Sequence, residues 1–157
     1  MNGRISLKIL TLAFLAATAS AASAETVQLA PGIQVTKKAY AAPINEQPFF
    51  GFEKKTTEQR EADDKFVKAL VEATGSREKA VDEVSKRGWR ALAGGRYGEA
   101  AQRFNQAFLV DPEQSVVYHG LAVIAQMRFK DAAFAEELYR IARKQPNPLK
   151  MLNADYG

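Results

Sequence analysis

The feature that most constrains the fold of this chain is an apolar pattern that recurs after 34 residues, so that Pro112 returns as Pro146. The other matched pairs are Phe104 with Leu138, Ala107 with Ile141, Ala91 with Ala125, and Val84 with Tyr118. A fixed period of this length is typical of repeat architectures, in which one unit cannot bury its apolar face alone and stacks on the next. We therefore expect two copies of one structural unit, over about 81–114 and 115–148.

Each unit is expected to be helical, because its apolar residues recur at spacings of three and four rather than two. Thr56 and Gln59 form a capping box that starts the first helix, and Gly75 ends it. The stripe expected to face inward on that helix consists of Ala62, Phe66, Ala69, Leu70 and Ala73. Four further helices are expected from Ser76 to Gly94, from about 98 to 109, from near 115, and over about 131–144. The predicted fold is all-α, with antiparallel helical hairpins stacked over 56–157.

The segment 95–112 resembles the second half of a tetratricopeptide repeat, with Ala100, Phe104 and Pro112 at that family's Ala-x3-Phe and Pro positions. Gly88 stands at the family's small-residue position in the preceding helix. This resemblance implies a short tetratricopeptide-like solenoid whose second copy is degenerate or terminal. A wider resemblance, carried by Pro48 to Phe52, Gly88-Trp89 and Arg103 to Ala107, is to exported tetratricopeptide proteins of Gram-negative bacteria. That resemblance implies the periplasm.

In such an architecture the first helix of each hairpin lines a concave groove, where these modules hold a peptide. The groove-facing residues are then Ser85, Trp89, Leu92, Val116, His119, Val123, Gln126 and Met127. Exposure of Trp89 is unfavourable unless something covers it, either a partner or the chain's own segment 49–52 or first helix. The resemblance thus implies a scaffold for a peptide or cell-envelope protein. The alternative is a small structural subunit of an envelope complex, with its groove filled by its own N-terminal aromatic segment.

Residues 1–24 are expected to form a secretory signal peptide that is cleaved after Ala24. Its parts are a positive start at Arg4 and Lys8, an apolar run over 9–17, and a small-residue cleavage site at 22–24. The apolar run is shorter than the roughly 20 residues of a membrane-spanning helix. We therefore expect a periplasmic or secreted protein with no membrane insertion after cleavage, and an uncleaved anchor is the alternative.

The charge of the chain bears on nucleic-acid binding, and its cysteine content bears on how the fold is held together. The chain has 22 Lys and Arg against 18 Asp and Glu, and loss of Arg4 and Lys8 with the signal peptide leaves a net charge of +2. Basic residues occur at most in adjacent pairs. No nucleic-acid partner is expected, because binding to phosphate backbones requires clustered cations. The sequence has no cysteine, so the fold must be held without disulfides.

Residues 25–55 are expected to be an extended or disordered lead-in, because Pro31, Pro43 and Pro48 interrupt any helical period. Within this lead-in, the segment 49–52 carries three phenylalanines. Exposing three aromatic rings to water is unfavourable, so we expect them to dock on the helices that follow. The alternative is that they form a hook that binds a partner.

No catalytic, cofactor or metal site is expected. His119 is the only histidine and has no cysteine to share a metal with. The adjacent carboxylates at 63–64 and 136–137 diverge by about 100° on a helix and do not form a catalytic pair. The glycine-rich turn 94–98 lacks the Lys-Ser/Thr of a phosphate-binding loop. These features predict a protein that is not an enzyme.

Overall fold

The computed structural model describes residues 23–148, which contain five α-helices and one two-stranded sheet. The expectation of a mainly helical fold is confirmed over this range. Apart from residues 23 and 24, the predicted signal peptide lies outside the described residues, as does the part of the predicted repeat domain after Pro148.

Three of the five helices begin at residues whose side chains satisfy free backbone groups. α1 (Thr57–Thr74) starts at the predicted capping box, in which Thr56 Oγ1 accepts a hydrogen bond from the Gln59 N–H at 3.2 Å. The Gln59 side chain in turn accepts from the Thr56 N–H at 2.9 Å. α2 (Arg77–Ala93) follows Ser76, which caps it, and α5 (Ala132–Lys144) is capped by Asp131. Between them lie α3 (Tyr97–Val110) and α4 (Ser115–Met127).

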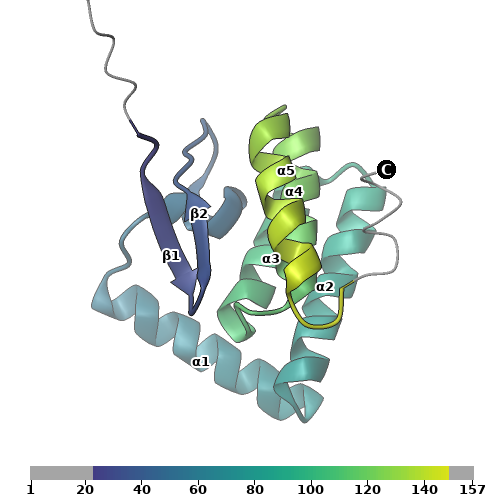
Figure 1. Cartoon of the computed structure of the whole chain (residues 1–157). Helices are drawn as coiled ribbons and strands as arrows, with labels where there is room; N and C mark the ends of the chain where they lie inside the picture. The colour runs from purple at the N-terminus through teal and green to yellow at the C-terminus, as the bar shows by residue number, and fades with distance from the viewer. Residues whose placement is uncertain (1–22, 149–157) are drawn as a thin grey trace, which may run out of the picture.

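The core forms where α2 packs on α3 and α4 packs on α5, with α3 also against α4 (Figure 1). Phe104 of α3 is fully buried between two glycines. A Cβ added at Gly88 of α2 would lie 2.9 Å from the Phe104 ring, and one at Gly120 of α4 would lie 2.3 Å from it. The Phe104 ring therefore fills the space between α2 and α4. Because glycine has no side chain, α2 and α4 both approach α3 closely enough to contact the Phe104 ring.

α1 packs less tightly than predicted. It has no fully buried residue, and it contacts the core through Val67, Leu70 and Val71. Ala62, Ala69 and Ala73 of the predicted inner stripe are exposed. The prediction was wrong for these alanines because alanine fits either face of a helix, whereas β-branched Val67 and Val71 supply more apolar surface for burial. In the view of Figure 1, α1 lies below the sheet and the other helices and runs across them.

The lead-in over 25–55 is ordered: it contains extended strands, as one of the two predicted alternatives allowed, and these add a small sheet to the mainly helical fold. β1 (Thr26–Ala30) and β2 (Ile33–Thr36) form an antiparallel hairpin in which Val27 pairs with Val35. Gly32, at φ 74°, provides the positive φ that the turn needs. The sequence carries a short alternating signal in both strands: Val27 and Leu29 alternate with exposed residues in β1, and Ile33 and Val35 do so in β2. The prediction missed it because each run is only four or five residues long.

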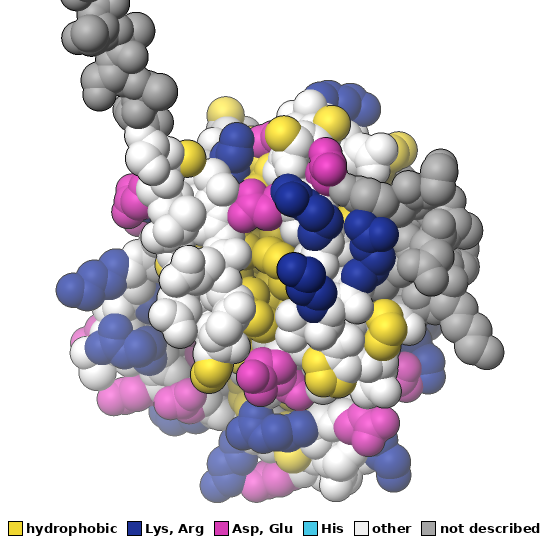
Figure 2. Space-filling model, viewed as in Figure 1, with side chains coloured by type: hydrophobic (Ala, Val, Ile, Leu, Met, Phe, Trp, Pro, Cys, Tyr) yellow, Lys and Arg dark blue, Asp and Glu magenta, His cyan; other side chains and the backbone are white. Residues whose placement is uncertain are grey.

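The hairpin is attached to the helices by polar and apolar contacts. The Thr36 N–H donates to Glu137 Oε1 of α5 at 2.7 Å. The Tyr40 ring stacks on Phe129 with centroids 4.0 Å apart, and its hydroxyl donates to Asp131 at 3.0 Å. Figure 2 shows hydrophobic side chains in the seam between hairpin and helices, with Lys and Arg side chains on the adjoining surface. The hairpin is thus part of the folded unit.

Two short 3-10 segments, η1 (Ile44–Glu46) and η2 (Pro48–Phe52), complete the lead-in. Phe49 is buried, and its ring lies 5.3 Å from that of Phe108 and 5.8 Å from that of Tyr118. Phe50 is half-buried, with Lys55 Nζ 3.6 Å from its ring centroid. The expected docking of the aromatic segment is therefore confirmed for Phe49.

Candidate functional site

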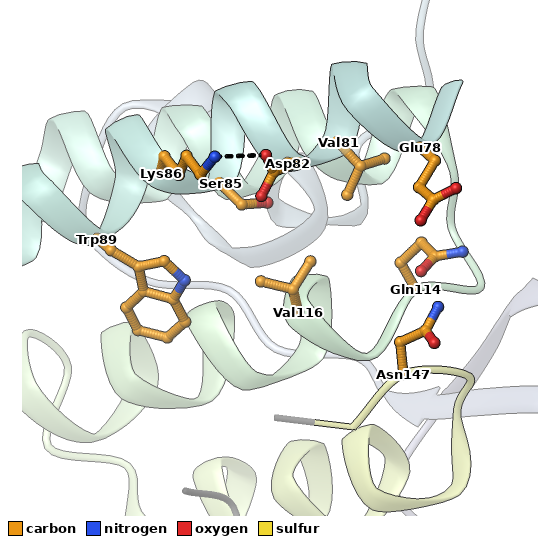
Figure 3. A pocket seen from close by; sticks show the side chains of 9 residues that line it. All are labelled: Glu78, Val81, Asp82, Ser85, Lys86, Trp89, Gln114, Val116 and Asn147. Carbon is orange, nitrogen blue, oxygen red and sulfur yellow. Dashed lines mark ion pairs between the residues drawn. The ribbon is translucent and has the colours of Figure 1, made fainter. Parts of the chain in front are cut away.

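A groove of about 300 Å³ runs between α2 and the start of α4. The side chains that line it are Glu78, Val81, Asp82, Ser85, Lys86, Trp89, Gln114, Val116 and Asn147. The first six project from α2, Gln114 and Val116 flank the start of α4, and Asn147 follows α5 (Figure 3). The α2 residues recur at spacings of three and four and therefore share one face of the helix.

The structure brings three of the eight predicted groove residues together: Ser85, Trp89 and Val116. Leu92 and Val123 are half-buried against the core instead, and His119 is buried, with 4% of its surface exposed. Gln126 and Met127 are exposed on the last turn of α4 and do not line this groove. The groove is therefore shorter than predicted and lies toward the first turns of α4.

Trp89 forms one end of the groove (Figure 3). Its ring packs edge-on against Phe104 at 4.8 Å and against His119 at 5.1 Å between centroids. The side chain is half-buried, so part of it belongs to the core and part faces the groove. Its position is consequently set by the same ring, Phe104, that joins the hairpins.

The aromatic lead-in does not cover Trp89. No residue of 25–55 is among the side chains lining the groove in the described part of the chain. Phe49 lies instead against Phe108 and Tyr118. The alternative in which the N-terminal aromatic segment fills this groove, and the alternative in which it permanently covers Trp89, are both at odds with this arrangement.

Ser85 is the least satisfied polar residue of the groove. Only 4% of its surface is exposed, and its Oγ has no hydrogen-bond partner among the described residues. A helical serine often donates to the carbonyl four residues earlier, here that of Val81, but Ser85 does not. A buried hydroxyl without a partner costs about 1–3 kcal/mol. Ser85 therefore offers a donor and an acceptor to any molecule that enters the groove.

The charges of the groove are largely neutralised. Lys86 Nζ lies 2.6 Å from the Asp82 carboxylate, and that hydrogen bond raises the pKa of Lys86. Glu78 has no ion-pair partner among the described residues. The Gln114 amide donates from Nε2 to Asp111 Oδ2 at 2.8 Å, which leaves its carbonyl oxygen available. The groove thus combines apolar walls with neutral hydrogen-bonding groups and one carboxylate.

Sequence reasoning missed six of the lining residues: Glu78, Val81, Asp82, Lys86, Gln114 and Asn147. Extending the helical spacing of Ser85 and Trp89 backward identifies Glu78 and Asp82 on the same face. No comparable signal exists for Asn147, which reaches the groove only because the chain turns after α5.

Within residues 23–148, no three His, Asp or Glu side chains are grouped as a metal site requires. Over the same range, no helix combines the length and apolar character needed to cross a bilayer. Comparison of the chain with protein-family models, with curated proteins and with solved structures gives no match.

Proposed function

We propose that this protein is an exported, tetratricopeptide-like interaction scaffold without catalytic activity, and that the groove between α2 and α4 holds a peptide or an envelope protein. The observation that carries the proposal is the convergence of Trp89, Val116 and Ser85 in one groove. Tryptophan is enriched among the residues that contribute most to protein interfaces, and apolar clefts with a few placed polar groups are typical binding sites.

Rigid packing beneath the groove supports the same function. Gly88 and Gly120 hold α2 and α4 closely around Phe104, and Trp89 rests on that ring. The groove walls therefore have fixed positions before a partner arrives, which lowers the entropic cost of binding.

Site-specific photo-crosslinking in the cell envelope tests the proposal. A benzophenone amino acid placed at Lys86, on the groove rim, is expected to capture a defined protein. The same group at the exposed Glu136 of α5 serves as the control and is expected not to capture it. Val116→Asp, which puts a charge on the apolar wall, should abolish capture at position 86 while leaving the helical circular dichroism unchanged.

The proposal is wrong if position 136 captures the same protein as efficiently as position 86, or if Val116→Asp does not reduce capture. Capture only at position 136 would instead favour a structural subunit that is held by its outer faces.

A further inference from the structure

The buried hydroxyl of Ser85 distinguishes this groove from an ordinary apolar depression. Its oxygen is enclosed and makes no hydrogen bond with the described residues, and the apolar side chains of Val81, Val116 and Trp89 line the same groove. Removing a hydroxyl from water without giving it a partner is unfavourable. An occupant that brings a hydrogen-bonding group to this point would remove that cost.

The electrostatics of the lining select the kind of group. The one cation among the described lining residues, Lys86, is paired with Asp82 at 2.6 Å. An anionic ligand would find no unpaired positive charge there and would face Glu78. A neutral group suits the floor, and a cation suits the rim beside Glu78.

The end of the groove opposite Trp89 adds two carboxamides. Gln114 and Asn147 face each other there, with Glu78 beside Gln114 (Figure 3). The Gln114 carbonyl oxygen is available because its amide nitrogen bonds to Asp111. Carboxamides match the donor and acceptor of a peptide group, so hydroxyl and carboxamides together offer bonds along an extended main chain.

We propose that the groove takes an extended, internal peptide segment through its main chain. A peptide group of the ligand hydrogen-bonds to Ser85 Oγ, an adjacent aliphatic side chain lies on Val116 and Trp89, and a Lys or Arg of the ligand pairs with Glu78. This inference rests on the proposed function and adds the chemistry of the partner: neutral main chain, apolar anchor and basic flank.

Selection from a phage-displayed library of random 12-residue peptides on the purified full-length protein tests it, with Val116→Asp as counter-selection. Enriched peptides should share an aliphatic residue flanked by Lys or Arg. Ser85→Ala should weaken their binding about tenfold, the effect of one lost hydrogen bond. It should not lower the melting temperature, because the hydroxyl makes no bond in the free protein.

Peptide chemistry then locates the bond. Each nitrogen of the peptide main chain is methylated in turn. Methylation at one position should weaken binding to the wild type about tenfold and should not weaken binding to Ser85→Ala any further. Glu78→Lys should weaken the basic peptides, whereas the matched charge reversal Glu136→Lys, on the exposed face of α5 outside the groove lining, should leave peptide affinity unchanged.

Two outcomes overturn this inference while leaving the groove as a binding site: an acidic consensus, or peptides that bind Ser85→Ala as tightly as the wild type. A groove occupied by a second copy of the chain would give no enriched peptide and a dimer in solution that Val116→Asp dissociates, and this also overturns it. Failure of the proposed function is recognised separately, by photo-crosslinking that is insensitive to Val116→Asp.

Discussion

The Asn105 side chain of α3 accepts a hydrogen bond at Oδ1 from the Phe49 N–H at 2.9 Å, which ties two residues 56 positions apart. Its Nδ2 donates to the carbonyl oxygens of Gln47 at 2.8 Å and Asn45 at 3.1 Å. One fully buried carboxamide therefore satisfies three backbone groups of the lead-in. The bonds coincide with a left-handed backbone at Phe49 and Phe50, with φ of 54° and 56°. Such conformations are unfavourable for phenylalanine and persist where surrounding contacts hold them.

Replacement of Asn105 should destabilise the protein without affecting the groove directly. We expect Asn105→Leu to lower the free energy of unfolding by about 3 kcal/mol, because the Phe49 N–H loses its partner in a buried setting. Asn105→Asp should also destabilise, since its second carboxylate oxygen would face the carbonyls of Gln47 and Asn45. Chemical denaturation measures both, and Gln102→Ala, in a half-buried contact with Glu46, is the milder control. Equal stability of Asn105→Leu and Gln102→Ala would contradict this role.

The packing around Phe104 predicts a difference between three glycine substitutions. A Cβ at Gly120 would lie 2.3 Å from the enclosed Phe104 ring, so Gly120→Ala should lower the free energy of unfolding by about 3 kcal/mol. Gly88→Ala, at 2.9 Å, should cost less. Gly94→Ala is the control, because its nearest neighbour is the mobile end of exposed Arg96. Thermal denaturation should rank the melting temperatures in the order Gly94→Ala, Gly88→Ala, Gly120→Ala, highest first. A different order would mean that the ring is not confined as described.

Trp89 provides an optical probe of the groove, because it is the only tryptophan in the chain. Binding of a selected peptide should shift its fluorescence emission to shorter wavelength and reduce quenching by acrylamide, since its exposed part loses water. Met127→Asp, on the exposed end of α4 outside the groove lining, should leave the titration unchanged. If peptides bind without altering the emission, the ligand site lies elsewhere. Trp89→Ala is unsuitable as a binding test, because loss of its contacts with Phe104 and His119 should itself destabilise the fold by about 3 kcal/mol.

Two tyrosines should make stability fall at alkaline pH. Burial raises the pKa of Tyr118 above its usual value of about 10, and the nearby Glu113 and Asp111 add to the rise. Burial likewise raises the pKa of Tyr40, aided by its hydrogen bond to Asp131. A group whose pKa is higher in the folded than in the unfolded state contributes full stability below the unfolded pKa and loses it as pH rises toward the folded one.

The free energy of unfolding should therefore decline above about pH 10. Replacing both tyrosines by phenylalanine should flatten that decline, although the variant is less stable at neutral pH because the Tyr118 hydroxyl no longer donates to the Pro112 carbonyl. Urea denaturation across the pH range measures the slope. A double variant that declines as steeply as the wild type would show that other groups dominate.

The sequence by itself determined the helices, because their signals are local. Capping at Thr56 and Ser76 depends on neighbours three residues away, and the apolar spacing indicates which face packs in α2 to α5, although not for the alanines of α1. The family resemblance likewise marked Gly88 as a small-residue position and Phe104 as an aromatic position, but the contact of that ring with Gly120 is seen only in the structure. Ser85, Trp89 and Val116 followed from the same periodicity together with the family resemblance.

Only the tertiary structure decided the N-terminal hairpin, the role of Asn105 and the far end of the groove. The hairpin over 26–36 forms because Val35 is buried and Thr36 bonds to Glu137, contacts that join residues about a hundred positions apart. In the sequence, nothing distinguishes Asn105 from other polar residues of a helix, and its role is seen only in its hydrogen bond with the lead-in. The far end of the groove needs Asn147 to return beside Gln114. Helix signals act over a few residues, whereas burial and distant hydrogen bonds depend on how the whole chain is packed.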